Sequence, residues 1–239
     1  MAIQTTSTDI HLRSSQATGL LSTTPFSVVT WINAVWNSGS RTSYVGIYGP
    51  ATDTPLATPV TAVQIGASTG NYDLVCWTWG GGTLVGTATG TMTGYNNIWT
   101  FIAYTYDGIN HVLYRDGVQL ATTTNAQIAG YLNQIYINGY PGGTTAETGS
   151  FLVDQYGLYR RALLPDEILT IYKAGGARHG IVNGSMCKCE FDEGAEASSV
   201  TTVVDLSGNG NNLTTTGAGT AMSYIYAGTY ANTNIRMVQ

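Results

Sequence analysis

Residues 97–124, NIWTFIAYTYDGINHVLYRDGVQLATTT, constrain the fold more than any other part of the chain. In WTFIAY (99–104), Trp, Phe and Ala alternate with Thr, Ile and Tyr, and this period of two is typical of a β-strand. Asp-Gly pairs follow at 107–108 and 116–117, and such pairs supply the positive φ that tight hairpin turns require. The segment therefore predicts three successive antiparallel strands joined by short turns.

The rest of the chain also consists of short β-prone runs separated by turn residues. One helix is expected near residues 165–175, because Pro165 suits the first helical position and Gly175-Gly176 ends the apolar stripe. A break at Gly157 indicates a β-bulge. Many strands with one late helix predict an all-β fold, a two-sheet antiparallel jelly-roll sandwich. The segments predicted as strands are 25–36 (buried on both faces), 43–49, the hairpin 71–90, 133–140 and 150–163, with a proline-rich loop at 50–61.

Charged residues are scarce, which excludes some classes of partner. They make up 10% of the chain, against about 25% in ordinary globular proteins, and the formal net charge is −5. Nucleic-acid binding needs clustered Lys and Arg, so no nucleic acid is expected as a partner. No run of 18 apolar residues and no signal-peptide pattern occur, so neither membrane insertion nor secretion is expected. The composition suits a subunit of an assembly, and equally an ordinary β-sandwich.

Three cysteines, Cys76, Cys187 and Cys189, are too few for a disulfide framework. On a strand, Cys187 and Cys189 would point to the same face with Cα atoms about 6.5 Å apart, near the upper limit for a disulfide. A zinc site would need two further ligands, and His179 is the only candidate nearby. We therefore expect free thiols, which fit a reducing cytoplasm.

Three stretches together resemble a known family: FSVVTWI (26–32), WTFIAYTYDGINHVLYRDGVQL (99–120) and GSFLVDQYGLYRRALLPDEILTIYKAG (149–175). They are similar to the laminin-G-like, concanavalin A-like jelly-roll domain over about 150 residues. Leu164 departs from the family, which usually has a Ser or Thr helix cap there; Pro165 and the acidic first turn compensate. The residues that match in order and spacing are Trp99, Ala103, Asp107, Gly108, Tyr114, Asp116, Gly117, Asp154, Tyr159, Arg161, Ala162, Leu163, Glu167, Ile168 and Tyr172.

The resemblance also implies a circular permutation. In this family a segment like CEFDEGAEASSVTTVVDLSGNGNNLT (189–214) usually comes first, whereas here it follows the helix. We expect one jelly-roll domain over 1–239, with a main body at 1–176. Residues 177–239 would then complete the sandwich, either within the same chain or by exchange between copies.

A structural calcium ion is a further expectation from the resemblance, since concanavalin A-like families often hold one through oxygen ligands. Asp154 and Asp192 would lie on neighbouring strands if the permuted segment takes its family position. Asp205, Asn209 and Asn211 form a second oxygen-rich candidate. The alternative for Asp205 and Asn209 is that they cap a turn by accepting hydrogen bonds from backbone N–H groups.

Carbohydrate binding is the usual function of the fold, because exposed aromatic rings stack on sugars while polar loops bind hydroxyls. The candidate platforms are Trp36, Trp77, Trp79, Tyr95 and Tyr140, although aromatic residues also fill sandwich cores. Trp31 and Trp99 are expected in the core.

Catalysis has little support in the sequence. Retaining glucanases of this architecture need two carboxylates about 5–5.5 Å apart on one strand, and their E-x-D-x-x-E pattern is absent. FDEGAE (191–196) is interrupted by a glycine, and the three histidines are dispersed. We therefore expect a non-catalytic binding or assembly module, with no catalytic residues.

Domains resembling this one occur in virion proteins of tailed phages. The leading hypothesis is a virion-associated structural protein, such as a capsid decoration or fibre component, assembled in the host cytoplasm. Its partners would be copies of itself or a capsid protein. The alternative hypothesis is a soluble, lectin-like carbohydrate-binding domain.

Overall fold

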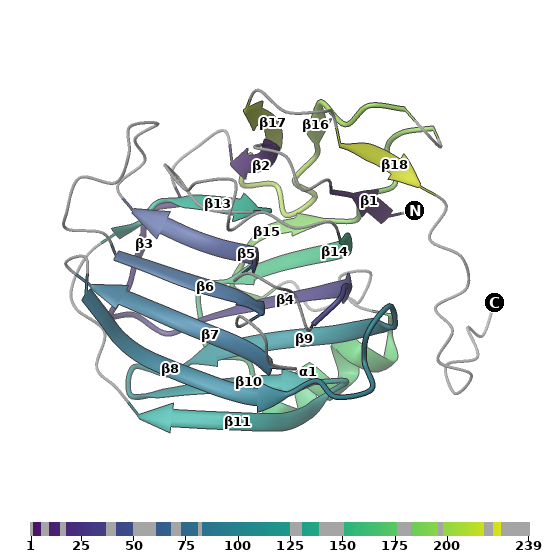
Figure 1. Ribbon diagram of the computed structural model, residues 1–239. Coiled ribbons are helices and arrows are strands. Elements are labelled where there is room, and N and C mark those ends of the chain that lie inside the picture. The colour runs from purple at the N-terminus through teal and green to yellow at the C-terminus, as the bar shows by residue number, and fades with distance from the viewer. Residues whose placement is uncertain are drawn as a thin grey trace.

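The computed structural model describes the chain in twelve stretches that together form a two-layered β-sandwich (Figure 1). Within the described residues, the strands form two eight-stranded sheets, here called sheet A and sheet B, and one two-stranded sheet. Every strand pair is antiparallel, which confirms the predicted fold class. The described residues are 2–5, 10–14, 18–36, 42–49, 61–67, 73–80, 83–124, 131–138, 151–175, 183–195, 198–217 and 222–225.

Sheet A contains the three strands predicted from residues 97–124. Its order is β11 (Val118–Thr124), β10 (Asn110–Arg115), β9 (Trp99–Tyr106), β4 (Phe26–Asn33), β14 (Leu152–Tyr159), β1 (Ala2–Gln4) and β18 (Ser223–Ile225), with β15 (Ser185–Cys189) also paired to β14. The two Asp-Gly turns are confirmed: Gly108 and Gly117 have φ of 106° and 79°. The predicted bulge is also confirmed, because the β14–β4 register shifts between Asp154 and Gly157.

Sheet B faces sheet A. Its order is β16 (Thr202–Val203), β17 (Leu213–Gly217), β2 (Ile10–Ser14), β13 (Gln134–Ile137), β5 (Thr42–Gly49), β6 (Thr61–Ala67), β7 (Asp73–Gly80) and β8 (Thr83–Thr91), and beside it β3 (Leu20–Leu21) pairs β12 (Tyr131–Leu132). The predicted hairpin at 71–90 is confirmed as β7 and β8. Strand β6 was not predicted. The predicted loop at 50–61 lies outside the described residues, apart from Thr61, which begins β6.

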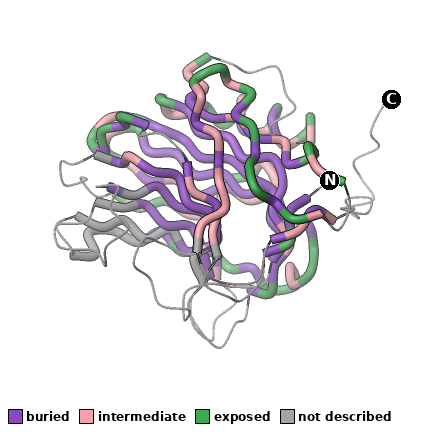
Figure 2. The backbone as a smooth tube through the Cα atoms, turned by 90° about the horizontal axis from the view of Figure 1, so that it is seen from above, coloured by how far each residue is buried: buried purple, intermediate pink, exposed green. Residues whose placement is uncertain are grey.

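Strand β4 is buried on both faces, as its near-continuous apolar sequence predicts. Val28 and Ile32 point into the core between the sheets, whereas Val29 and Trp31 point to the outer face of sheet A. That outer face is covered by the predicted helix, α1 (Pro165–Lys173), which lies behind the strands in Figure 1. The buried residues in Figure 2 follow the strands of both layers. Of the described helical residues, none belong to a helix long and apolar enough to cross a membrane.

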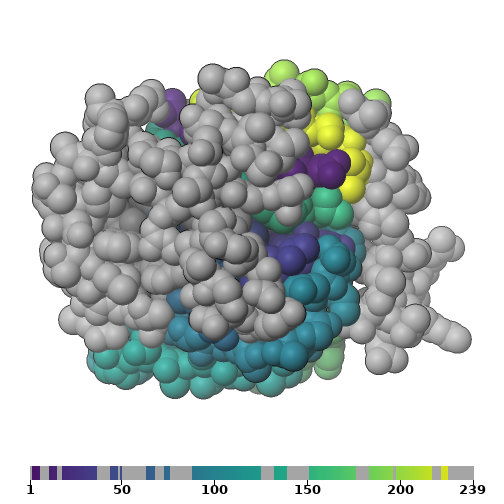
Figure 3. Space-filling model, in the orientation of Figure 1, coloured from purple at the N-terminus to yellow at the C-terminus, as the bar shows by residue number. Residues whose placement is uncertain are grey.

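Three of the four described strands of the late segment, residues 177–239, pair with strands of the main body in the same chain; the fourth, β16, pairs with β17. β15 pairs with β14, β17 with β2, and β18 with β1. In Figure 3 the surface of the last of these strands, in yellow, lies beside that of β1, in purple. This is the arrangement that the permutation implies when the segment folds onto its own domain; exchange between copies stays a prediction.

Candidate functional site

Two cavities of about 380 Å³ each share Arg160, the residue that follows β14. The first, here called the polar pocket, is lined by Thr18, Arg160, Gly184, Ser185, Met186, Asn209 and Asn211. The second, the apolar groove, includes Leu20, Leu21 and Pro25 in its lining. Four segments that are far apart in sequence therefore meet at Arg160.

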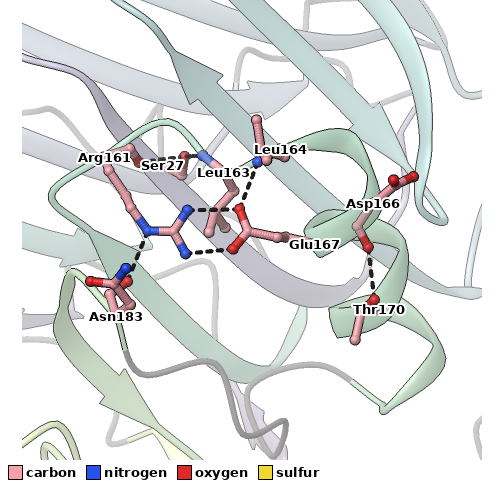
Figure 4. A network of polar contacts seen from close by, with 8 residues as sticks. All are labelled: Ser27, Arg161, Leu163, Leu164, Asp166, Glu167, Thr170 and Asn183. Atoms are coloured by element: carbon pink, nitrogen blue, oxygen red, sulfur yellow. Dashed lines mark hydrogen bonds and ion pairs between the residues drawn. The ribbon is translucent and has the colours of Figure 1, made fainter.

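The first support of this region is an ion pair at the start of α1. Both carboxylate oxygens of Glu167 accept hydrogen bonds from the Arg161 guanidinium at 2.7 Å, and Glu167 Oε2 also accepts the Leu164 N–H at 2.9 Å (Figure 4). Hydrogen bonding to Arg161 lowers the pKa of Glu167, and the same bonds raise the pKa of Arg161. Glu167 thus does the capping that Leu164 cannot do, because leucine has no side-chain acceptor.

Arg161 also fixes the turn that leads into β15. Its Nε donates to the Asn183 carbonyl oxygen at 2.9 Å, and a Cβ on Gly184 would lie only 3.2 Å from Arg161 Cγ (Figure 4). Gly184 has a φ of 76°, which favours glycine there. Its carbonyl oxygen accepts the Arg160 N–H at 2.7 Å. The ion pair at α1 therefore sets the position of Ser185 and of the backbone of Arg160.

The opposite wall of the polar pocket is the loop at 205–211, which is organised by Asp205. Asp205 Oδ1 accepts the backbone N–H groups of Lys188 and Ser207, and Oδ2 accepts that of Asn211, all at 2.9 Å. Asp205 is only 6% exposed. Glycines 208 and 210 have positive φ, so the chain turns tightly around this carboxylate. The loop is thereby fixed against β15.

Two amide side chains connect this loop to the start of β15. Asn209 Nδ2 donates to the Ser185 carbonyl oxygen at 3.0 Å, and Asn211 Nδ2 donates to that of Met186 at 2.7 Å. Asn211 is only 5% exposed, so its position is set by packing. Since both amides use their nitrogen for the protein, their Oδ1 atoms are left as acceptors.

Arg160 supplies N–H donors to the polar pocket. The Arg160 side chain is exposed, and its Nη2 donates to the Thr18 carbonyl oxygen at 3.1 Å. A guanidinium has five N–H donors, so most of them remain available. Ser185 Oγ is buried without a hydrogen-bond partner among the described residues. The pocket can therefore donate and accept hydrogen bonds.

Comparison with known proteins agrees with this architecture. The family model described as the concanavalin A-like lectin/glucanases superfamily matches residues 6–169. The chain belongs to this superfamily. The match confirms the resemblance found in the sequence, and it ends before the late segment that forms one wall of the polar pocket.

Solved structures show the same superfamily fold at low identity. A protein of Bacteroides ovatus ATCC 8483 to which carbohydrate binding is attributed has 15% identity and a TM-score of 0.62, over 95% of this chain and 60% of its own. The heptameric SAP-like pentraxin of Limulus polyphemus has 14% identity and a TM-score of 0.54, over 72% of this chain and 79% of its own. This chain thus spans only part of the first structure's length. No curated protein sequence matches it.

Of the aromatic residues predicted as sugar platforms, the structure describes the side chains of Trp36 and Tyr95. Trp36 is fully buried and packs edge-on against Tyr44, with ring centroids 5.1 Å apart, so its prediction as an exposed platform was wrong. Tyr95 is half-buried, and the Arg115 guanidinium lies 4.2 Å from its ring centroid. The side chains of Trp77 and Trp79, and all of Tyr140, lie outside the described residues. Trp31 and Trp99 are in the core, as predicted.

The residues predicted to bind calcium lie in different surroundings, and calcium binding stays a prediction. Asp154 is fully buried in β14, whereas Asp192 is exposed beyond the end of β15. Asp205 uses its oxygens for three backbone N–H groups, which matches the turn-capping alternative. Asn209 and Asn211 hydrogen-bond backbone carbonyl groups. No group of three or more His, Cys, Asp or Glu among the described residues could hold a metal ion.

The two cysteines of β15 are free and buried, as expected. Their sulfur atoms are 3.7 Å apart, and Cys187 Sγ also contacts the Asn211 carbonyl oxygen at 3.6 Å. The hydrogen bond with Cys189 and burial raise the pKa of the Cys187 thiol. Cys187 therefore packs against Asn211, which lines the polar pocket.

Sequence reasoning found one wall of the pocket and missed the rest. Asp205, Asn209 and Asn211 were named, with calcium as their ligand. Arg160, Ser185 and Thr18 were not named. The sequence did contain one signal for Arg160, because the chain has only nine basic residues and two of them are adjacent at 160 and 161. Arg161 matches the family motif, whereas Arg160 is not part of that motif, so Arg160 calls for another role.

Proposed function

We propose that this chain is a non-catalytic glycan-binding module and that the polar pocket holds the sugar. The observation that carries the proposal is a pocket of about 380 Å³ whose lining has both donors and acceptors. Ligand pockets usually measure about 300–1,000 Å³ and use a few well-placed polar groups. Sugar hydroxyls donate and accept at once, and this cavity is lined both by Arg160, which has free N–H donors, and by Asn209 and Asn211, whose amide oxygens can accept.

Rigidity supports the proposal. Each wall is held by buried or charge-assisted hydrogen bonds: Arg161 to Glu167 on one side and Asp205 to three backbone N–H groups on the other. A preformed pocket loses little conformational entropy when a ligand binds, which favours affinity. Superfamily membership and the likeness to a Bacteroides ovatus protein of attributed carbohydrate binding point the same way.

The absence of catalysis is part of the proposal. Glycoside hydrolysis needs a pair of carboxylates beside the scissile bond. The described residues that line the polar pocket include no Asp or Glu. We expect no new reducing ends when the protein is incubated with polysaccharides, and their appearance would contradict this part of the proposal.

A glycan array probed with the full chain tests the proposal, with Asn209→Ala as the pocket variant. Asn209 is exposed, so the variant should fold with a loss of no more than about 1 kcal/mol while losing its array signal. Asn33→Ala is the matched control, because the Asn33 amide makes one long hydrogen bond of 3.4 Å on another strand. The proposal fails if no glycan binds, or if both variants keep the wild-type signal.

The proposal also includes the aromatic residues that were predicted to stack on sugars and whose side chains lie outside the described residues. Trp77 and Trp79 occupy β7, opposite Gln64 and Ala62 of β6, on a different part of the molecule from the polar pocket. We propose that they, with Tyr95 and Tyr140, form a second contact for an extended glycan. Trp77→Ala should then weaken binding of a long oligosaccharide more than that of a short one, and equal effects would remove these residues from the site.

A virion-associated assembly role is the second candidate function, with copies of this chain or a capsid protein as partners and the host cytoplasm as the place of assembly. The observation that favours it is that the late segment contributes edge pairings through β15, β17 and β18. The same pairings could form between copies by exchange. Light scattering after size exclusion tests it: an oligomer supports this role, and a monomer that binds glycans opposes it.

Exchange has its own test, because the polar pocket combines Arg160 of the main body with Asn209 of the late segment. In exchanged copies each pocket would contain residues of two chains. Arg160→Gln and Asn209→Ala chains, refolded together, would then regain glycan binding that neither shows alone. Binding that stays absent in the mixture would mean that each chain completes its own pocket.

A further inference from the structure

Basic residues are concentrated in the stretch of sequence that follows β14 and includes Arg160, although the chain as a whole is acidic. Five of the nine Lys and Arg residues fall within residues 160–188, a range that holds only two of the 14 acidic residues. Those two are Asp166 and Glu167, and Glu167 is bound to Arg161. Arg160, by contrast, has no carboxylate partner among the described residues.

We infer that the ligand of the polar pocket is an acidic sugar, in which a carboxylate or a sulfate group binds Arg160. This inference rests on the proposed glycan-binding function and gives its ligand class. Arg160 lines both cavities, and the one hydrogen bond of its side chain within the described residues goes to the Thr18 carbonyl oxygen. A planar guanidinium with free N–H groups binds an oxyanion through two parallel hydrogen bonds, which are stronger than neutral ones.

The other pocket residues distinguish an acidic sugar from a simple inorganic anion. An anion only accepts hydrogen bonds, so a pocket built for it needs donors alone. Here the amide oxygens of Asn209 and Asn211 are acceptors, because their nitrogens are bound to backbone carbonyl groups. Asn211 is 5% exposed and cannot turn freely. Hydroxyl groups beside the anionic group would satisfy these acceptors, and an acidic sugar carries both.

The negative net charge of the protein makes this arrangement selective. With a formal charge of −5, the chain repels anions in general, so an acidic ligand is retained only where a local cation meets it. The Arg160 guanidinium is fixed at its base, because its backbone N–H is bound to the Gly184 carbonyl oxygen at 2.7 Å. Arg160 is therefore assigned as the residue that determines specificity for charge.

Calorimetric titration of the full chain with three trisaccharides tests the inference. One ends in glucuronic acid, the second is its carboxyl-reduced neutral counterpart, and the third is that counterpart with a 6-sulfate. The wild type should bind at least one acidic probe about tenfold or more tightly than the neutral one, and preference between the two identifies the group. This advantage should shrink in 0.5 M salt, because screening weakens exposed charge pairs.

Three variants separate the role of Arg160 from general charge. Arg160→Gln should abolish the advantage of the acidic probe over the neutral one. Arg160→Lys, which keeps the charge but loses the planar fork, should retain part of it. Lys173→Gln is the matched control, because it removes the same charge from an exposed position at the end of α1. Thermal melting of each variant verifies that it is folded.

The outcomes separate this inference from the function on which it rests. If wild type and Arg160→Gln bind the acidic and neutral probes equally, the acidic-sugar inference is wrong while glycan binding stands. If Lys173→Gln loses as much as Arg160→Gln, the effect is one of net charge and the assignment of Arg160 is wrong. If no probe and no array glycan binds, both proposals fail.

Discussion

The Asp205→Ala substitution tests whether the loop at 205–211 is held by hydrogen bonds or by a metal ion. The Asp205 carboxylate accepts three backbone N–H groups at 2.9 Å, from Lys188, Ser207 and Asn211. Alanine would leave all three N–H donors without their acceptor. Asp205 is only 6% exposed, so these donors would be left at a nearly buried position. The free energy of unfolding should therefore fall.

The magnitude follows from these contacts. A hydrogen bond to a charged group contributes about 1.5–3 kcal/mol, but water can reach part of an emptied loop and the three bonds are not additive. We expect a loss of about 3–5 kcal/mol, a large share of a typical stability of about 5–15 kcal/mol. Asp205→Asn keeps one oxygen that accepts the backbone N–H groups of Lys188 and Ser207. Its amide nitrogen, a donor, then faces the Asn211 N–H, which is also a donor. Its loss should be smaller, about 1–2 kcal/mol.

Urea unfolding followed by tryptophan fluorescence, with 1 mM calcium and with chelator, measures both the loss and its cause. A calcium site with a Kd of 10 μM would add about 2.7 kcal/mol to the wild type in 1 mM calcium. Turn capping by Asp205 predicts no such gain and the same loss in both buffers. A loss below about 0.5 kcal/mol would refute the capping argument. A loss confined to the calcium buffer would restore Asp205 as a metal ligand.

Three further predictions concern the supports of the pocket. Glu167→Gln should cost about 1 kcal/mol at pH 7. Because the pKa of Glu167 is lowered in the folded state, this contribution exists above the unfolded pKa and is lost as pH falls through the folded pKa, so the difference in melting temperature between the two proteins should shrink in acid; Asp166→Asn is the control. Gly194→Ala should cost about 1–3 kcal/mol in urea unfolding, since its Cβ would clash with the Tyr224 ring; an unchanged midpoint would mean that this ring moves freely. Deletion of residues 187–239 should leave an insoluble or unfolded product because β14, β1 and β2 lose partners, and a truncated chain with a cooperative melt would contradict this.

The parts of the fold that were predictable are those in which local pattern and tertiary position agree. In 97–124 the alternation and the Asp-Gly turns are sufficient to specify β9, β10 and β11, because hairpin contacts are local. The helix at 165–175 was predicted from its proline, its apolar stripe and its glycines, and it is observed over Pro165–Lys173. Strand β6 was not predicted because its strand pattern is weaker: glycine and glutamine interrupt the apolar residues of VQIGA (63–67).

Trp36 shows where single-residue reasoning fails. An aromatic residue is expected both in a protein core and in a sugar-binding site, so the residue type alone does not distinguish them. The two differ in the direction of the Cα–Cβ bond, toward the core or toward solvent. Trp36 lies just after β4, where the period of two has ended, so the sequence does not give its face. In the structure it is buried against Tyr44 of β5, a contact that depends on how sheet A lies on sheet B.

The polar pocket could not be predicted for a different reason. Its residues come from positions 18, 160, 185 and 209, so no local spacing connects them. They meet because β15 adds to β14 and because Asp205 ties the next loop back to β15. The sequence did suggest that the late segment returns to the main body, but the register of that return decides which side chains face Arg160.

The position of the pocket couples the completion of the fold to the binding of a ligand. One wall, with Arg160, belongs to the part of the chain that matches the superfamily model; the other, with Asn209 and Asn211, belongs to the part that follows it. A ligand that contacts both walls adds to the free energy of their association by mass action. Glycan binding and strand pairing of residues 177–239 should therefore stabilise each other. This reciprocity holds whether the segment completes its own chain or a neighbouring copy, because either pairing creates the same two walls.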